Sequence, residues 1–161
     1  MKKLNGLTAI VVIGFGAILL GFSSCKNTAP KKTIKAEAPA YKISLAQWSI
    51  NKMIREDKVS PYEFASIASN WGFEGLEYVS QLYTDVTKSD DPEAAIKIFI
   101  QKNNELSAKF GLKNILIMVD EEGNLATQNE EERLTAIENH KKWINAAAAM
   151  GCHSIRINLF G

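Results

Sequence analysis

Short catalytic motifs are missing from this 161-residue chain, which contains only two cysteines and two histidines. We find no glycine-rich phosphate loop, Cys-x-x-Cys pair, Gly-x-Ser-x-Gly elbow or His-Glu-x-x-His helix. Its 19 basic and 18 acidic side chains give a net charge of +1. This balance argues against a nucleic-acid partner, whose phosphates require a basic face. No residue pattern therefore defines a catalytic site by itself.

The N-terminus is typical of an export signal. Lys2 and Lys3 precede an apolar run over residues 7–22, and small residues then lead into Cys25. This junction resembles the bacterial lipobox, so we predict a lipoprotein signal peptide over residues 1–24 and lipidation of Cys25. The protein would then be anchored by lipid to a membrane of the cell envelope, facing the periplasm or the outside. Phe22 departs from the usual lipobox leucine, which leaves an uncleaved membrane anchor as the alternative.

Residues 25–40 carry repeated Lys, Ala, Thr and Pro without an aromatic run, which predicts a flexible tether. The remaining segment, residues 41–161, is the predicted domain. Once Cys25 is acylated, only Cys152 remains, so no intramolecular disulfide is available to stabilise the fold. We interpret Cys152 as a small buried residue, with a reactive thiol or a ligand as the alternative.

From Tyr41 onward, short apolar runs alternate with longer helical segments, which predicts βαβ units and a parallel sheet. We predict strands over residues 42–50, 75–80, 113–119 and 153–159. Helices are expected to begin at Ser60, Asp91 and Asn129, because each is a good N-cap. Two architectures fit this order: the first half of a (β/α)8 TIM barrel, cut after its fourth strand, or an open four-stranded sheet.

Candidate site residues lie in or just after the predicted strands, because functional groups of barrels gather at the carboxyl ends of strands. In the fourth strand, Arg156 and Asn158 alternate with aliphatic residues and should share the inward face, unless this is a solvated edge strand. Glu77 is a partner for Arg156, in a structural or a catalytic pair. The full set predicted to contact a substrate is Gln47, Trp48, Glu77, Asp120, Arg156 and Asn158.

Three of these predictions have alternatives. Trp48 offers an aromatic face to a sugar ring, or it packs in the core. The run from Asp120 to Glu122 follows the third strand, and we interpret it as a solvated acidic loop whose side chains diverge; Asp120 is its best candidate for a ligand. His140 is expected to be a surface or packing residue of the third helix, and His153 to be structural.

Five segments in order resemble one protein family: ISLAQWS at 43–49, GLEYV at 75–79, LIMVD at 116–120, ENHKKW at 138–143 and GCHSIRIN at 151–158. Together they are similar to the N-terminal half of the sugar phosphate isomerase/epimerase family, which are xylose isomerase-like TIM barrels, and especially to its exported bacterial members. The resemblance covers residues 42–161.

This resemblance implies a small sugar substrate, a homo-oligomer, and proton transfer next to a sugar carbonyl, assisted by a divalent metal such as Mn²⁺, Mg²⁺, Zn²⁺ or Co²⁺. In such families the metal ligands come mainly from later strands, so we expect no metal in this chain alone and no activity from it alone. Two alternatives stay open. One is a non-catalytic carbohydrate-binding lipoprotein, and the other is a lyase or epimerase that acts on oxidised glycosides.

Overall fold

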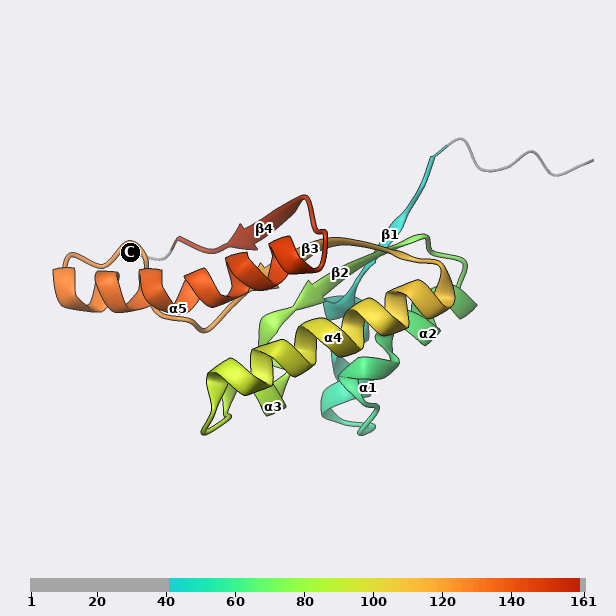
Figure 1. The fold of residues 1–161 in the computed structure, drawn as a ribbon, viewed down its shortest axis with the longest axis horizontal. Coiled ribbons are helices and arrows are strands. Elements are labelled where there is room, and N and C mark those ends of the chain that lie inside the picture. The colour runs from blue at the N-terminus through green and yellow to red at the C-terminus, as the bar shows by residue number, and fades with distance from the viewer. Residues whose placement is uncertain (1–40, 160–161) are drawn as a thin grey trace, which may run out of the picture. The chain divides into compact units, whose positions relative to one another are not determined.

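The fold is an α/β arrangement around one parallel sheet, seen in a computed structural model that describes residues 41–159 (Figure 1). The predicted signal peptide, Cys25 and the tether lie outside these residues. Within the described part, no helix is long and apolar enough to cross a membrane. The four strands are parallel neighbours in sequence order: β1 (Ser44–Ala46), β2 (Gly75–Val79), β3 (Lys113–Val119) and β4 (Ser154–Ile157).

Helices fill each connection between consecutive strands. The principal ones are α2 (Phe64–Asn70), α4 (Pro92–Phe110) and α5 (Glu130–Ala149). The three predicted N-caps are confirmed, since the side chains of Ser60, Asp91 and Asn129 each accept a hydrogen bond from a backbone N–H of the first turn. The short helices are α1 (Asn51–Arg55), α3 (Thr84–Thr87) and the 3₁₀ turns Gln47–Ile50, Pro61–Glu63 and Ser80–Leu82.

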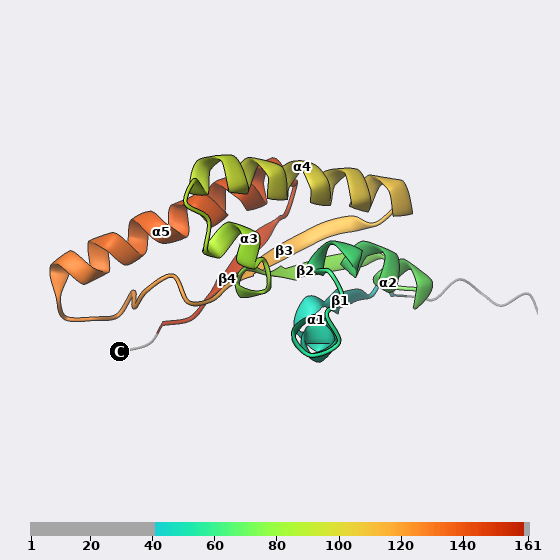
Figure 2. The same cartoon turned by 90° about the horizontal axis from the view of Figure 1, so that it is seen from below.

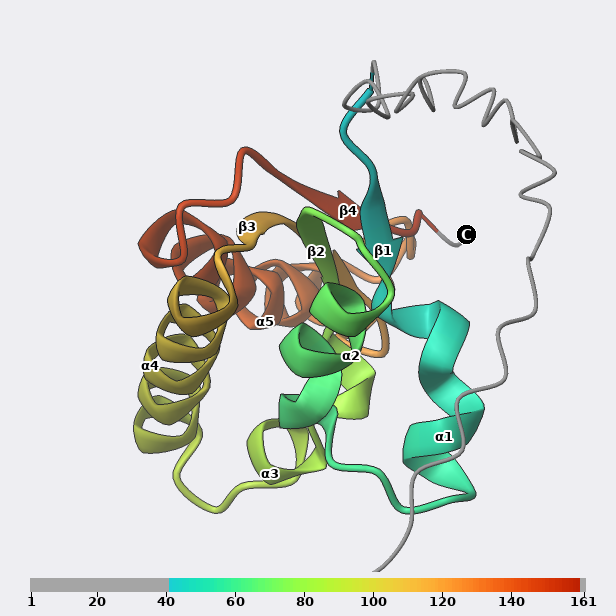
Figure 3. The same cartoon turned by 90° about the vertical axis from the view of Figure 1, so that its right-hand side faces the viewer.

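One face of the sheet is covered by α2, α4 and α5, as Figures 2 and 3 show from two directions. Aromatic side chains fill the space between the sheet and these helices. Tyr78 of β2 meets Phe99 of α4 edge to face, with 6.2 Å between ring centroids, and Phe99 meets Trp143 of α5 at 5.3 Å. All three rings are fully or almost fully buried, so this side of the sheet is the hydrophobic core.

Sequential strand order with the helices on a single face confirms the predicted α/β class and is consistent with part of a TIM barrel. In a doubly wound sheet, by contrast, the order reverses at a switch point and helices cover both faces. Residues 41–159 form an open sheet of four strands and do not themselves close a barrel. The uncovered face corresponds to the face that a complete barrel turns toward its interior.

The sequence-based boundaries were wrong at both ends of the sheet. The first strand was predicted to reach Ile50, but it ends at Ala46 because the chain turns into a 3₁₀ helix at Gln47. The Asn51 side chain stabilises this turn by donating to the carbonyl of Trp48 at 2.5 Å. The sequence did not predict helices α1 and α3, and β4 is shorter than predicted, ending at Ile157.

Candidate functional site

A pocket of about 430 Å³ lies at the carboxyl ends of the four strands. Each strand contributes to its wall, directly or through the residues that follow it. The lining residues are Trp48 after β1, Val79 and Gln81 at the end of β2, Met118, Asp120 and Glu121 at the end of β3, and Arg156 and Asn158 from β4. Four of the six predicted substrate contacts therefore line this pocket: Trp48, Asp120, Arg156 and Asn158.

Asp120 is the centre of the polar wall. Its carboxylate accepts hydrogen bonds from Nη2 of Arg156 at 3.1 Å, from Nδ2 of Asn158 at 2.5 Å and from Nε2 of Gln81 at 3.3 Å. Arg156 also donates through Nη1 to the amide oxygen of Asn158 at 2.7 Å. The Asp120 backbone N–H donates to the Ser80 hydroxyl at 3.0 Å, which holds the start of the loop against β2. The carboxylate is therefore held in one position by three donors.

Strand register explains why these groups meet. Arg156 of β4 lies opposite Met118 of β3, so Asp120, two residues further along, falls beside Asn158. Alternation along β4 places Arg156 and Asn158 on the same side, as the sequence predicts, while Ile155 packs against the helix-covered core. The Arg156 side chain stays 45% exposed and forms an ion pair with the largely buried Asp120 carboxylate.

The opposite wall of the pocket depends on Arg55, a residue of α1 that sequence reasoning missed. Its guanidinium lies 4.8 Å from the centroid of the Trp48 ring, and Nη2 donates to Oε1 of Gln81 at 2.6 Å. Gln81 in turn donates to Asp120. Trp48 is 42% exposed, so its indole is available to a ligand. No periodic signal marks a five-residue helix, and Arg55 could not be placed without the fold.

Gln47 does not line the pocket, although it directly precedes Trp48. Its amide is fully buried: Oε1 accepts from the Val79 N–H at 3.0 Å, and Nε2 donates to the Tyr83 hydroxyl at 3.0 Å and to the Pro61 carbonyl at 3.1 Å. Burial raises the pKa of Tyr83 well above its ordinary value, so this partner is a neutral phenol. Gln47 therefore ties β1 to β2 and supports the position of Trp48.

Glu77 also lies away from the pocket, and the predicted pair between Glu77 and Arg156 is absent. Glu77 shares a rung of the sheet with Leu116 and Ser154, whereas Arg156 shares the rung of Met118 and Val79, two residues closer to the carboxyl ends. The Glu77 carboxylate instead accepts a hydrogen bond from the Ser44 hydroxyl of β1. The prediction failed because alternation identifies the face of a residue but not its rung.

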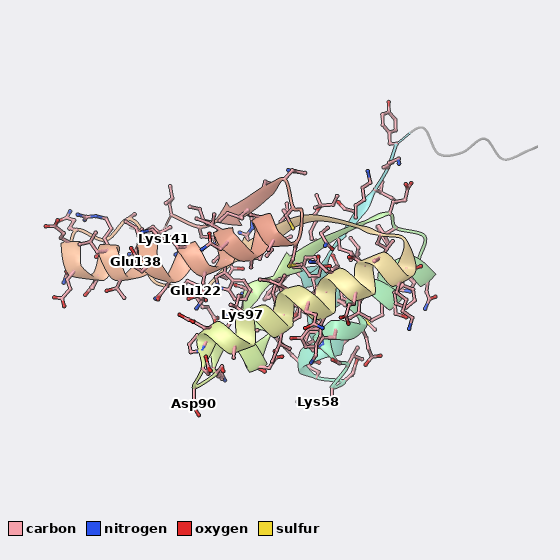
Figure 4. The ribbon with its side chains drawn as sticks, in the orientation of Figure 1. Lys58, Asp90, Lys97, Glu122, Glu138 and Lys141 are labelled. Atoms are coloured by element: carbon pink, nitrogen blue, oxygen red, sulfur yellow. The ribbon has the colours of Figure 1, made fainter. Side chains whose placement is uncertain are left out.

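The acidic run after β3 diverges as predicted, but it is not a solvated loop throughout. Glu121 has a positive φ of 66°, and the next residue, Glu122, is only 8% exposed. Its carboxylate accepts from Nε1 of Trp143 at 2.5 Å and from Nζ of Lys142 at 2.9 Å (Figure 4 labels Glu122 beside α5). Trp143 is buried and needs an acceptor for its indole N–H, which explains why this carboxylate turns inward.

His140 lies on the buried face of α5. Of the two positions predicted for it, surface or packing, the structure shows the buried one. It is 5% exposed, and Nδ1 lies 2.7 Å from the Ala136 carbonyl oxygen. Its ring lines a second pocket of about 250 Å³, whose other lining residues include Asp120, Glu122 and Asn158. Its spacing from the buried residues Ala136 and Trp143 could have indicated this face from the sequence.

A divalent metal does not fit the donor set of this pocket. The Asp120 carboxylate is occupied by three hydrogen-bond donors, one of them a guanidinium whose charge would repel a cation. Glu122 is engaged by Lys142 and Trp143. Between residues 41 and 159, no three His, Cys, Asp or Glu side chains gather in a group able to hold a metal ion. No catalytic step through a metal follows from these residues.

The chain is an α/β protein whose sheet carries a polar pocket at the carboxyl ends of its strands. No protein-family model matches it, and no curated protein sequence does. Its fold is similar to the crystal structure of 3-keto-D-glucoside 4-epimerase from E. coli in the apo form, with a TM-score of 0.46 and 19% sequence identity. That match covers 60% of this chain and 32% of the epimerase chain, so the chain spans about a third of that protein.

Proposed function

We propose that this domain forms the sugar-binding wall of a protein of the sugar isomerase/epimerase kind. The observation that carries the proposal is the convergence of Trp48, Asp120, Arg156 and Asn158 on one pocket, from the ends of three different strands. Ligand sites of parallel α/β proteins occupy this edge of the sheet. The resemblance of five sequence segments to that family supports the same substrate class.

The composition of the pocket suits a small, uncharged, polyhydroxylated ligand. Its volume of about 430 Å³ is within the usual range for small-molecule sites. Arg156, Asn158 and Gln81 have N–H groups left to donate to sugar hydroxyls, and the amide oxygens of Asn158 and Gln81 can each accept one more hydrogen bond. The Trp48 ring offers a face for sugar C–H groups. Arg156 pairs with Asp120, and Glu121 is the remaining charged side chain of the lining, so the pocket carries no excess of positive charge. This balance favours a free sugar over a sugar phosphate.

We further propose that this chain alone binds sugar without turning it over. Proton transfer next to a carbonyl needs a base with a free lone pair, and the Asp120 carboxylate is already engaged by Arg156 and Asn158. In the proposed complete barrel, side chains other than those of residues 41–159 would bind the divalent metal. They would also provide the carboxylates that transfer the proton.

Binding and turnover can be tested separately on the purified chain. Calorimetric titration with D-fructose, D-glucose and a 3-keto-glucoside should detect binding of at least one sugar, and the third ligand tests the alternative of oxidised glycosides. Trp48→Ala should weaken this binding about fivefold, since stacking on an aromatic face contributes on the order of 1 kcal/mol. Lys97→Ala, an exposed change on α4 labelled in Figure 4, is the matched control and should leave binding unchanged.

The turnover arm adds Mn²⁺, Mg²⁺, Zn²⁺ or Co²⁺ and follows ketose and aldose epimerisation by NMR. We expect none, and turnover by the isolated chain would refute the assignment of the wall to binding alone. A non-catalytic carbohydrate-binding protein is the second candidate, and the pairing of Asp120 with Arg156 favours it. Binding without turnover, by a form of the protein that contains a closed barrel, would support this second candidate.

We propose that the domain is tethered to a membrane of the cell envelope by lipid on Cys25, on the strength of the lipobox-like junction. Expression in a bacterium fed with a clickable palmitate analogue tests this directly. The label should be incorporated into the full chain and lost in Cys25→Ser. Cys152→Ser, the change at the other cysteine, should keep the label. Equal labelling of both variants would contradict lipidation at Cys25.

A further inference from the structure

A second pocket continues the candidate site toward α5. It has a volume of about 250 Å³ and shares Asp120, Glu121 and Asn158 with the first pocket. The wall that is unique to it includes Glu122 and His140. Glu122 is bound to Trp143 and Lys142, so its oxygens are engaged. Of the two titratable side chains in this wall, His140 is the one that has a polar atom left to offer; Asn124, which also lines it, has its amide oxygen bound to the Ala126 N–H.

The hydrogen bond of the His140 ring defines which atom that is. Nδ1 lies 2.7 Å from the carbonyl oxygen of Ala136, one turn earlier in α5. A carbonyl oxygen can only accept, so Nδ1 carries a proton, and with a single ring proton placed there Nε2 has a free lone pair. Among residues 41–159, the contact of Nδ1 is the only hydrogen bond of the ring. Nε2 is thus a hydrogen-bond acceptor with no protein donor in the described part of the chain.

We infer that His140 is a substrate-contacting residue, whose Nε2 accepts a hydrogen bond from a sugar hydroxyl. The inference rests on the proposed function and deepens it. A sugar held by Asn158 at the boundary of the two pockets would extend one hydroxyl toward β3 and α5, where His140 lines the wall. The matching ligand is a polyol or sugar with at least two free hydroxyls, because its contacts lie in two adjoining pockets.

A packing role alone does not account for a histidine at this position. Nε2 has no protein partner, and no fully buried side-chain nitrogen or oxygen of residues 41–159 lacks one, so Nε2 is accessible to solvent. A phenylalanine would fill the same space but would offer no acceptor there. The contact with the Ala136 carbonyl does not require Nε2 either, yet it fixes the ring so that Nε2 is the acceptor. A fixed tautomer is useful when the ligand must be recognised by its donor hydroxyl.

The test is a titration of the uniformly ¹⁵N-labelled full chain with D-fructose and D-glucose, which reports the histidine rings, the Asn158 side-chain amide and the Trp48 indole. The chain has only two histidines, and His153 is exposed next to β4 at the end away from the pocket, so it serves as an internal control. We expect the free protein to show His140 protonated at Nδ1. On addition of sugar, the Nε2 resonance of His140 should shift with the same midpoint as the Asn158 side-chain amide, while His153 should not respond.

The outcomes separate this inference from the proposed function. If neither sugar shifts Asn158, Trp48 or His140, both proposals fail together. If Asn158 and Trp48 respond and saturate while Nε2 of His140 does not, the sugar site stands and the role of His140 is wrong. A free protein with the proton on Nε2 would also overturn it.

A variant gives the size of the contact. His140→Phe keeps an aromatic ring but removes the acceptor, and we expect the dissociation constant for the binding sugar to rise about fivefold, as for one net hydrogen bond. His140→Gln restores an acceptor and should recover part of the affinity. An unchanged dissociation constant in folded His140→Phe would overturn the inference. If His140→Phe does not fold, the wild-type titration decides.

Discussion

Two tryptophans, one on the helix-covered side of the sheet and one at the pocket, lie in very different surroundings. Trp143 lies on the helix-covered side of the sheet, fully buried against Phe99, with its indole N–H bound to Glu122. Trp48 lies at the carboxyl end of β1, 42% exposed and stacked on Arg55 at the pocket. Burial and a satisfied N–H stabilise the fold, whereas an exposed ring face is available for recognition. The helix-covered side should therefore govern stability, and the pocket should govern binding.

Alanine substitution of each tryptophan tests this difference between core and pocket most strongly. We expect Trp143→Ala to lower the free energy of unfolding by about 3–5 kcal/mol, because it removes a buried aromatic ring from the core. Trp48→Ala should change it by less than about 1 kcal/mol, because the ring lies at the surface, 42% exposed and outside the hydrophobic core. Urea unfolding followed by circular dichroism measures both values. Similar losses in the two variants would contradict the division into core and pocket.

The two carboxylates after β3 provide a second, smaller contrast. Glu122→Leu leaves the buried indole N–H of Trp143 without its acceptor, so we expect a loss of about 2–3 kcal/mol in the free energy of unfolding. Asp120→Asn should cost less than about 1 kcal/mol, because its ion pair with Arg156 is partly exposed and screened by solvent. Sugar binding should show the reverse order, with Asp120→Asn the more harmful change.

Neighbouring residues can also fall on opposite sides of the comparison, and Gln47 and Trp48 do. Gln47→Leu removes the acceptor of the buried Val79 N–H, so we expect a loss of about 1–2 kcal/mol in the free energy of unfolding. The folded fraction should still bind sugar within about twofold of wild type, because Gln47 does not line the pocket. A large loss of affinity in a well-folded Gln47→Leu protein would return this residue to the substrate contacts.

Part of the site could be predicted from the sequence because it follows from local rules. An N-cap residue such as Asp91 predicts the start of a helix. Alternation of residues along β4 and just beyond it predicts that Arg156 and Asn158 share one face. Since the carboxyl ends of parallel strands share an edge, Asp120 was expected near them. These inferences need only the period of a strand or the chemistry of a helix terminus.

The remaining features depend on contacts that are distant in sequence, and no local pattern encodes them. Gln47 leaves the strand because Val79 and Tyr83, more than 30 residues away, bind its amide. Arg55 reaches the pocket only because α1 forms. Likewise, a charged residue such as Glu122 is predicted to be solvated, because the sequence does not show that the buried Trp143 binds it. A side chain's face is a local property, and its partner is a property of the fold.

The smallest effect we expect concerns Cys152, which packs against the core on the helix-covered side. Burial raises the pKa of this thiol from 9.0 to about 11, because the thiolate is poorly solvated there. The unfolded chain loses the proton first, so the stabilisation is fully present below pH 9.0 and is lost as the pH rises toward about 11.

Urea unfolding of Cys25→Ser and of the double variant Cys25→Ser, Cys152→Ala measures this contribution, since no other thiol is present. The single variant should lose more stability between pH 9.0 and about 11 than the double variant does. Burial also raises the pKa values of Tyr78 and Tyr83, which are present in both proteins. The charge of Cys152 raises the pKa of Tyr78 further, so the difference between the profiles reports Cys152 together with its coupling to Tyr78. If the stability of the two variants changed in parallel with pH, water would reach Cys152. The helix-covered side would then be more accessible to solvent near β4 than at Trp143.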